Sequence, residues 1–200
     1  ERLSELTTSE SRDAVVAGSL GAEAARAALA SGDALRAMEL VVAAVQRNGA
    51  YAEVLEVAET AAVRSGREAD LSEVYERVSA AALGRFGRRS AHFRAARFFE
   101  QRSTWALALK HGVLAFSAVP GEGSAFLLLA RMSEFAGDRQ RAAQVISDVA
   151  SRSTSNRDKA RWYLRAAELP GEDEEAVRHR SEMLRLAVLA APRSDVLAMF

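Results

Sequence analysis

The stretches Ser31-Gly32-Asp33-Ala34 and Ala136-Gly137-Asp138-Arg139 repeat one pattern, in which a small residue, a glycine and an aspartate separate two apolar helical runs. Glycine suits the left-handed backbone that follows the last turn of a helix. Aspartate accepts the free amide protons at the start of the next helix. Both stretches are therefore predicted to be tight turns between two consecutive helices.

Turns of this kind recur along the chain at a near-constant interval. Their central positions are separated by 34, 37, 34 and 34 residues and are occupied by Gly32, Gly66, Ser103, Gly137 and Gly171. A fixed period of this length is typical of solenoids, in which each helix pair needs its neighbour to bury its apolar face. The three extra residues of the second interval are expected in the turn after Gly66, where Asp70 and Glu73 have the spacing of a capping box. The sequence thus predicts an all-α repeat fold.

Composition narrows the class of function. Hydrophobic residues make up 49% of the 200 positions, and no stretch shows the period-two alternation of a strand. The 27 basic and 27 acidic residues balance, which argues against nucleic acid or an anionic membrane as the main partner. There is no cysteine, which leaves the compartment undecided. No apolar run of membrane-spanning length and no signal peptide are visible, and a cytoplasmic location without membrane insertion is expected. Only two of the basic residues are lysines, which we interpret as the mark of a GC-rich, bacterial genome.

The helix pairs resemble the tetratricopeptide repeat (TPR), whose 34-residue units carry small residues at three fixed positions. Those positions hold Ala130, Ala142 and Val149 in the unit around Gly137, and the unit around Ser103 matches with alanines at 96, 108 and 115. The last unit fits only if about four residues are inserted after Gly171. The pentatricopeptide repeat has a similar length, but it binds RNA through a basic surface, which the neutral charge argues against.

The TPR resemblance implies a right-handed α-solenoid of antiparallel helix pairs, a TPR-like superhelix of about five units. The array is expected over residues 18–192. Residues 1–17 form an N-terminal segment, either the end of a preceding repeat or a cap, and residues 193–200 begin a further helix. The chain is expected to be part of a larger protein.

No residue constellation predicts catalysis. The three histidines are far apart in sequence, and Pro120-Gly121-Glu122-Gly123 lacks the lysine and hydroxyl residue of a phosphate-binding loop. The short cluster Arg88-Arg89 is too small for a nucleic-acid footprint. We therefore expect a protein that is not an enzyme and that holds no cofactor or metal.

One polar pattern stands out on the first helices of the pairs. Arg97, Arg131 and Arg165 follow one another at 34-residue spacing, and each has a glutamate three residues further on. By resemblance these positions face the inner groove, so an arginine ladder that engages a partner's carboxylates or carbonyls is one hypothesis. The alternative is a set of intrahelical ion pairs, each worth about 0.2–0.5 kcal/mol, which extend into a ladder between repeats.

The predicted function is a protein–protein interaction scaffold that binds a peptide or partner protein in a concave groove. The candidate partner-binding residues are Phe93, Arg97, Glu100, Leu127, Arg131, Trp162 and Arg165. The other interpretation of Trp162 is an aromatic wedge between helices. Two alternative functions remain open: a self-associating structural segment that forms a homo-oligomer, and a regulatory sensor module of a multidomain signalling protein.

Overall fold

The computed structural model describes residues 16, 19–48, 52–82, 84–169 and 171–192, so nearly all of the predicted segments 1–17 and 193–200 lies outside the described residues. All regular structure in these ranges is helical, without a strand, which confirms the all-α prediction. A helix over residues 19–30 comes first. It is followed by α2 (Ala34–Asn48), α3 (Ala52–Ser65), α4 (Glu68–Ala81), α5 (Gly84–Gln101), α6 (Trp105–Ala118), α7 (Gly123–Phe135), α8 (Arg139–Arg152), α9 (Asn156–Glu168) and α10 (Glu174–Ala190).

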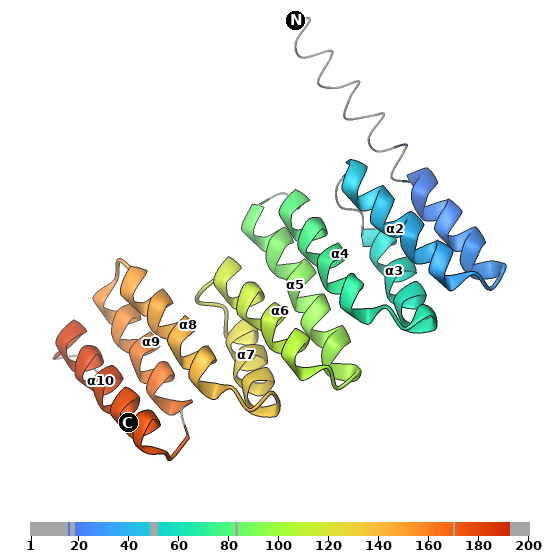
Figure 1. Ribbon diagram of the computed structural model, residues 1–200. Helices are drawn as coiled ribbons and strands as arrows, with labels where there is room; N and C mark the ends of the chain where they lie inside the picture. The colour runs from blue at the N-terminus through green and yellow to red at the C-terminus, as the bar shows by residue number, and fades with distance from the viewer. Residues whose placement is uncertain (1–15, 17–18, 49–51, 83, 170, 193–200) are drawn as a thin grey trace, which may run out of the picture. The chain divides into compact units, whose positions relative to one another are not determined.

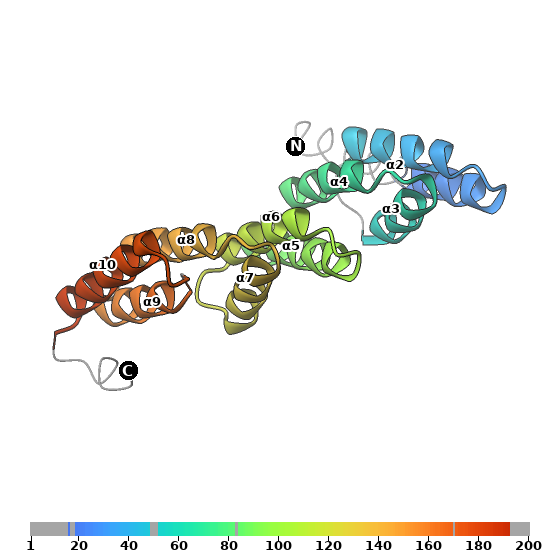
Figure 2. The ribbon, with the colours of Figure 1, turned by 60° about the horizontal axis from the view of Figure 1, so that its bottom comes forward.

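The helices pack as antiparallel pairs within two compact units, Glu1–Ala95 and Ala96–Phe200. In the first unit the helix over residues 19–30 pairs with α2, and α3 pairs with α4 (Figure 1). In the second unit α7 pairs with α8 and α9 pairs with α10. There α6, α8 and α10 form one row, and α7 and α9 lie on the other side (Figure 2). This is the architecture of a TPR-like helical-repeat protein.

The Gly-Asp turns have the predicted geometry. Gly137 has a φ of +68°, and the backbone N–H of Asp138 donates to the carbonyl of Ser133 at 2.9 Å, which closes the preceding helix with a Schellman-type bond. The side chain of Asp138 then accepts from the backbone N–H of Arg141 at 3.1 Å and caps the next helix. Asp33 makes the two corresponding bonds in the first unit.

The turn between α5 and α6 uses the same backbone path without a glycine. Ser103 has a φ of +55°, and the N–H of Thr104 donates to the carbonyl of Phe99 at 2.9 Å. A residue with a Cβ is disfavoured in this region by roughly 1–2 kcal/mol. The helix pair is therefore closed in spite of local strain, because the surrounding packing requires the same turn here.

The prediction for the 37-residue interval is wrong. α4 begins at Glu68, only two residues after Gly66, and Asp70 forms an ion pair with Arg67 instead of capping the helix. The turn after Gly66 therefore contains no extra residues. They lie in α5, which has 18 residues, whereas α7 and α9 have 13 each.

The insertion expected in the last helix pair is also absent. Ala176 follows Gly171 at the same distance as Ala142 follows Gly137, and both alanines are buried. α10 begins with its N-cap at Asp173, whose side chain accepts from the N–H of Ala176 at 2.8 Å. α10 begins three residues after Gly171, one residue later than α8 begins after Gly137, so the expected four-residue insertion is not found. The second helix of this pair has 17 residues and is longer than α8, which has 14.

Each unit has its own apolar core between the helix pairs. In the first unit the largest fully buried side chains are those of Met38, Leu71 and Tyr75. In the second unit Phe99 and His111 are both buried, and their rings stack with centroids 5.5 Å apart. Many of the remaining buried positions are alanines, which let helices approach closely and leave the longer side chains for the exposed faces.

Candidate protein-binding surface

The predicted partner-binding residues lie on α5, α7 and α9, the first helices of their pairs. Six of the seven belong to the second unit. Phe93 belongs to the first unit, where it is half-buried with the guanidinium of Arg89 at 5.4 Å from its ring centroid. The candidate surface is therefore built from the second unit alone.

Leu127 is the exposed apolar residue at the centre of this surface. Its side chain is 68% exposed, although its neighbours Phe126 and Leu128 are buried. Arg131 lies one helical turn further along α7, on the same exposed face. Because the core of this pair is already filled by the buried face of α7, Leu127 is not needed to stabilise the fold.

Arg131 links two consecutive helix pairs. Its Nε donates to Oε1 of Glu100 on α5 at 2.8 Å, and its Nη2 donates to Oε2 of the same carboxylate at 2.9 Å. Arg97 reaches Glu100 as well, with 3.5 Å between Nη1 and Oε2. Glu134, the expected intrahelical partner of Arg131, instead pairs with Arg139 of α8 at 2.7 Å. Two guanidinium groups thus share one carboxylate, which leaves a net positive charge.

Arg165 links α9 to α7. It forms the intrahelical pair that the spacing predicts, with 2.9 Å between its Nη1 and Oε2 of Glu168. Its guanidinium also lies 5.4 Å from the ring centroid of Phe126. Arg161, one turn earlier, is exposed, and its guanidinium lies 5.1 Å from the ring centroid of Trp162. The site prediction omits Arg161, although its position 34 residues after Leu127 places it at the equivalent point of the repeat.

Trp162 lies beneath the surface and not on it. Its side chain is only 5% exposed, and its ring packs edge-on against Phe116 with 5.3 Å between the centroids. Phe126 approaches from α7 at 6.1 Å. Trp162 is therefore an aromatic wedge between helices, because α9 turns position 162 inward and positions 161 and 165 outward.

A second bridge between helix pairs lies in the first unit and was not expected. Nε and Nη2 of Arg94 donate to the two carboxylate oxygens of Glu59 at 2.7 and 2.9 Å, and the hydroxyl of Tyr75 also donates to this carboxylate. Burial, followed by the hydrogen bond to Glu59, raises the pKa of Tyr75. The hydrogen bond to Glu59 raises the pKa of Arg94. These mutual contacts join α3, α4 and α5 and indicate a structural role.

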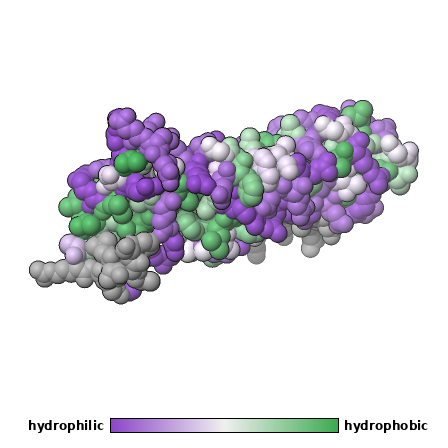
Figure 3. Space-filling view, turned by 90° about the horizontal axis from the view of Figure 1, so that it is seen from below, coloured by the Kyte–Doolittle hydropathy of each residue, from purple (hydrophilic) through white to green (hydrophobic). Residues whose placement is uncertain are grey.

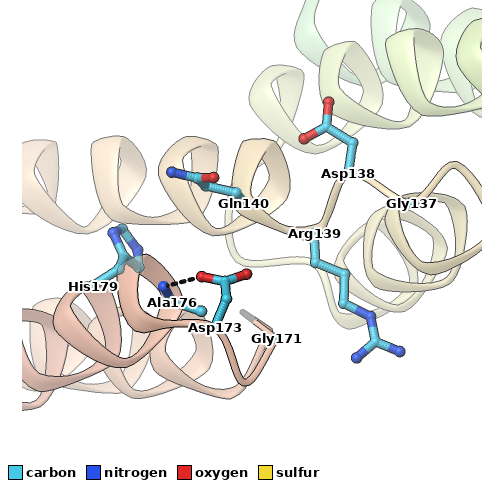
Figure 4. A pocket seen from close by; sticks show the side chains of 8 residues that line it. All are labelled: Gly137, Asp138, Arg139, Gln140, Gly171, Asp173, Ala176 and His179. Atoms are coloured by element: carbon cyan, nitrogen blue, oxygen red, sulfur yellow. Dashed lines mark hydrogen bonds between the residues drawn. The ribbon is translucent and has the colours of Figure 1, made fainter.

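A polar cavity of about 370 Å³ lies between the N-termini of α8 and α10 (Figure 4). Asp138 and Asp173 serve there as helix caps, and Gln140 donates to Glu175 at 2.6 Å. His179 contributes a buried Nε2 that makes no hydrogen bond with the described residues. The lining contains no hydroxyl or thiol nucleophile, and no cluster suited to a metal ion occurs in the part of the chain that the structure describes.

The outer face of α10 is apolar and exposed. Val177, Leu184 and Val188 lie on one side of this helix, with Leu189 beside them. Apolar residues gather on the surface at this end of the molecule (Figure 3). A cavity of about 320 Å³ that includes Leu164 and Leu184 adjoins the same face. None of the described helices is long and apolar enough to cross a membrane.

Comparisons with known proteins add likenesses of fold only. No protein-family model matches the sequence. No curated protein matches it significantly. Among solved structures the chain is similar to the TPR-like repeats of a putative kinesin light chain from Podosopora anserina, with 17% identity, a TM-score of 0.38, and coverage of 90% of this chain and 94% of that one.

It is also similar to MamA (41-end) from Desulfovibrio magneticus RS-1, with 14% identity, a TM-score of 0.38 and coverage of 85% and 94% of the two chains. MamA MSR-1 C2 is 19% identical over 90% and 99% of the two chains, with a TM-score of 0.32. At these identities and TM-scores the likenesses carry no argument about function. The assignment to the TPR-like class rests on the helix pairs and turns of the chain itself.

Proposed function

We propose that this chain is a non-catalytic scaffold that binds a peptide or protein segment on the exposed face of α5, α7 and α9 in its second unit. This first-helix surface consists of Arg97, Leu127, Arg131, Arg161 and Arg165. The observation that carries the proposal is the exposure of Leu127 between arginines on neighbouring first helices. A large apolar side chain in such a setting suits an anchor residue of a partner.

The charge of this surface favours a partner with carboxylates. Four arginines face two glutamates, Glu100 and Glu168, because Glu134 is engaged by Arg139 of α8. Guanidinium groups offer planar sets of donors that match a carboxylate or successive backbone carbonyls. Glu100 holds Arg131 in position in the free protein. A carboxylate of the partner would pair with Arg131 beside Glu100 or in place of it.

The test is capture of a partner from the lysate of the source cell by the whole chain. The triple variant R97A/R131A/R165A and the single variant L127A should each lose a specific partner that the unaltered chain retains. R178A/L189A, which removes an exposed arginine and an exposed leucine from α10, is the matched control and should retain it. Equal capture by all four proteins would refute the proposal.

The runner-up, self-association through the outer face of α10, is supported by the exposed Val177, Leu184 and Val188 on that face. Here the occupant is a second copy of the chain. Sedimentation velocity over a dilution series should then show concentration-dependent size, and Leu184→Glu should abolish it. A monomer at all concentrations would exclude this function and leave the first-helix surface unaffected.

A further inference from the structure

α5 begins earlier than the other first helices of the array. The three-residue insertion of the second interval and a short connection after α4 together extend it at its N-terminus. It contains 18 residues, where α7 and α9 contain 13. The additional turn holds Arg85, Phe86 and Arg88 in the first unit. No equivalent turn precedes α7 or α9, whose helices begin at Gly123 and Asn156.

The charge of this turn is opposite to what helix stability favours. The N-terminus of a helix carries a partial positive charge, which acidic side chains complement and arginines oppose. α4 and α10 follow the rule, with Glu68 and Glu174 in their first turns. α5 has no acidic residue in its first turn, and none occurs in its sequence before Glu100. The extra turn is therefore not explained by a contribution to helix stability.

The side chains of this turn are accessible. Phe86 is 60% exposed, and the guanidinium of Arg85 lies 5.2 Å from its ring centroid. Arg85 and Arg88 are exposed, and neither forms an ion pair with any residue that the structure describes. A phenylalanine in this position gains nothing from the core, and two guanidinium groups beside it keep their full donor capacity.

The turn is nevertheless held in place. A Cβ on Gly87 would lie 3.1 Å from the Cβ of Ala82, so the extra turn packs closely against the end of α4. One turn further along, Arg89 is half-buried and stacks over Phe93 at 5.4 Å. Arg85, Arg88 and the phenyl ring of Phe86 are therefore presented on a helical turn whose backbone passes close to the end of α4.

We propose that Arg85, Phe86 and Arg88, here called the α5 basic turn, bind an acidic peptide segment of a partner protein. Carboxylates of the segment pair with the two guanidinium groups, and an apolar or aromatic side chain packs on Phe86. Charge complementarity identifies the partner's chemistry. A nucleic-acid backbone or an anionic bilayer requires a broader basic or apolar surface than these three residues provide. The site lies in the first unit and does not depend on the first-helix surface.

The experiment measures fluorescence anisotropy with the whole chain and a labelled dodecapeptide of Asp and Glu around one Phe. R85Q/R88Q should weaken binding about tenfold or more at low salt. F86A should weaken it about threefold. R178Q/R185Q, which removes two exposed arginines from α10, should change it less than about twofold and is the matched control. In the R97A/R131A/R165A background, R85Q/R88Q should still weaken peptide binding by the same factor, which separates this site from the first-helix surface.

Loss of folding does not obscure the result. Removing arginines from the positive end of α5 should leave the thermal midpoint unchanged or raise it. If the thermal midpoint of R85Q/R88Q is lower than that of the unaltered chain, the effect of F86A on peptide binding alone tests the proposal. Equal weakening in the two double glutamine variants, or equal binding of an Asn/Gln version of the peptide, would overturn the proposal. Tighter binding of anionic phospholipid vesicles or of polyuridine RNA through the same residues would overturn it in favour of another class of partner.

Discussion

Two bridges between helix pairs can be compared directly, Glu59–Arg94 in the first unit and Glu100–Arg131 in the second. Both are bidentate, and both join first helices of consecutive pairs. The glutamate side chains are 20% and 18% exposed, and the arginines are 40% and 44% exposed. The difference lies in the third group at each carboxylate, which is the fully buried Tyr75 in the first unit and the half-exposed Arg97 in the second.

The cost of breaking an ion pair depends on the groups that it leaves behind. Without Glu59, the buried hydroxyl of Tyr75 loses the carboxylate that accepts its hydrogen bond. Without Glu100, two half-exposed arginines return to water at little cost. The first bridge is therefore a fixed element of structure. The second can exchange its carboxylate for that of a partner, as the proposed function requires.

The largest expected effect follows from removing each carboxylate. Glu59→Ala should lower the free energy of unfolding by about 2–3 kcal/mol. Glu100→Ala should lower it by about 0.5–1 kcal/mol. Urea titrations followed by circular dichroism measure both changes. Because Trp105 and Trp162 both lie in the second unit, tryptophan fluorescence reports on that unit separately. Equal destabilisation by the two substitutions would contradict the distinction between the bridges.

The pH dependence of the free energy of unfolding distinguishes the Glu59–Arg94 bridge further, because only this bridge includes a tyrosine. The pKa of Tyr75 is raised from its ordinary value of 10.0 in the folded protein, so the unfolded chain loses this proton first. Stability from this group is present below pH 10 and is lost as the pH rises above it. Relative to Tyr75→Phe, the unaltered chain should lose about 1 kcal/mol between about pH 10 and 11. Parallel pH curves for the two proteins, measured by urea midpoint, would show that Tyr75 is not coupled to the fold in this way.

A smaller effect is expected in the turns. Ser103→Gly should stabilise the second unit by about 0.5 kcal/mol, because relief of the left-handed strain exceeds the added entropy of the unfolded glycine. Gly137→Ser, at the equivalent turn with a φ of +68°, should destabilise it. The midpoint of the tryptophan-detected transition measures both. Shifts of the same sign would mean that local turn strain does not control these positions.

Much of the fold could be predicted because its determinants are local. The Gly-Asp turns at Gly32 and Gly137 are formed by hydrogen bonds between residues a few positions apart, so they can be predicted from the local sequence. The period of these turns then predicts the helix pairs. The intrahelical pair of Arg165 with Glu168 is confirmed for the same reason.

The candidate site could be predicted less well, because its contacts join different helix pairs. The spacing of Arg131 and Glu134 favours a local pair, but the packing of α7 against α5 and α8 gives each residue a partner on another helix. The arginine ladder as a binding surface therefore stays a proposal. The repeat spacing places Arg161 at the groove position of Leu127, and the structure shows that it is exposed.

The sequence by itself thus determined the all-α repeat, the pairing of helices and the chemistry of the turns, since these follow from short-range capping and from the need of each pair to bury an apolar face. Only the tertiary structure decided that Trp162 is buried, that Glu100 joins two arginines, and that the extra residues lengthen α5 instead of the turn after Gly66. These outcomes depend on how side chains far apart in sequence meet across neighbouring helices, and the strength of such contacts is set by burial that no local pattern reveals.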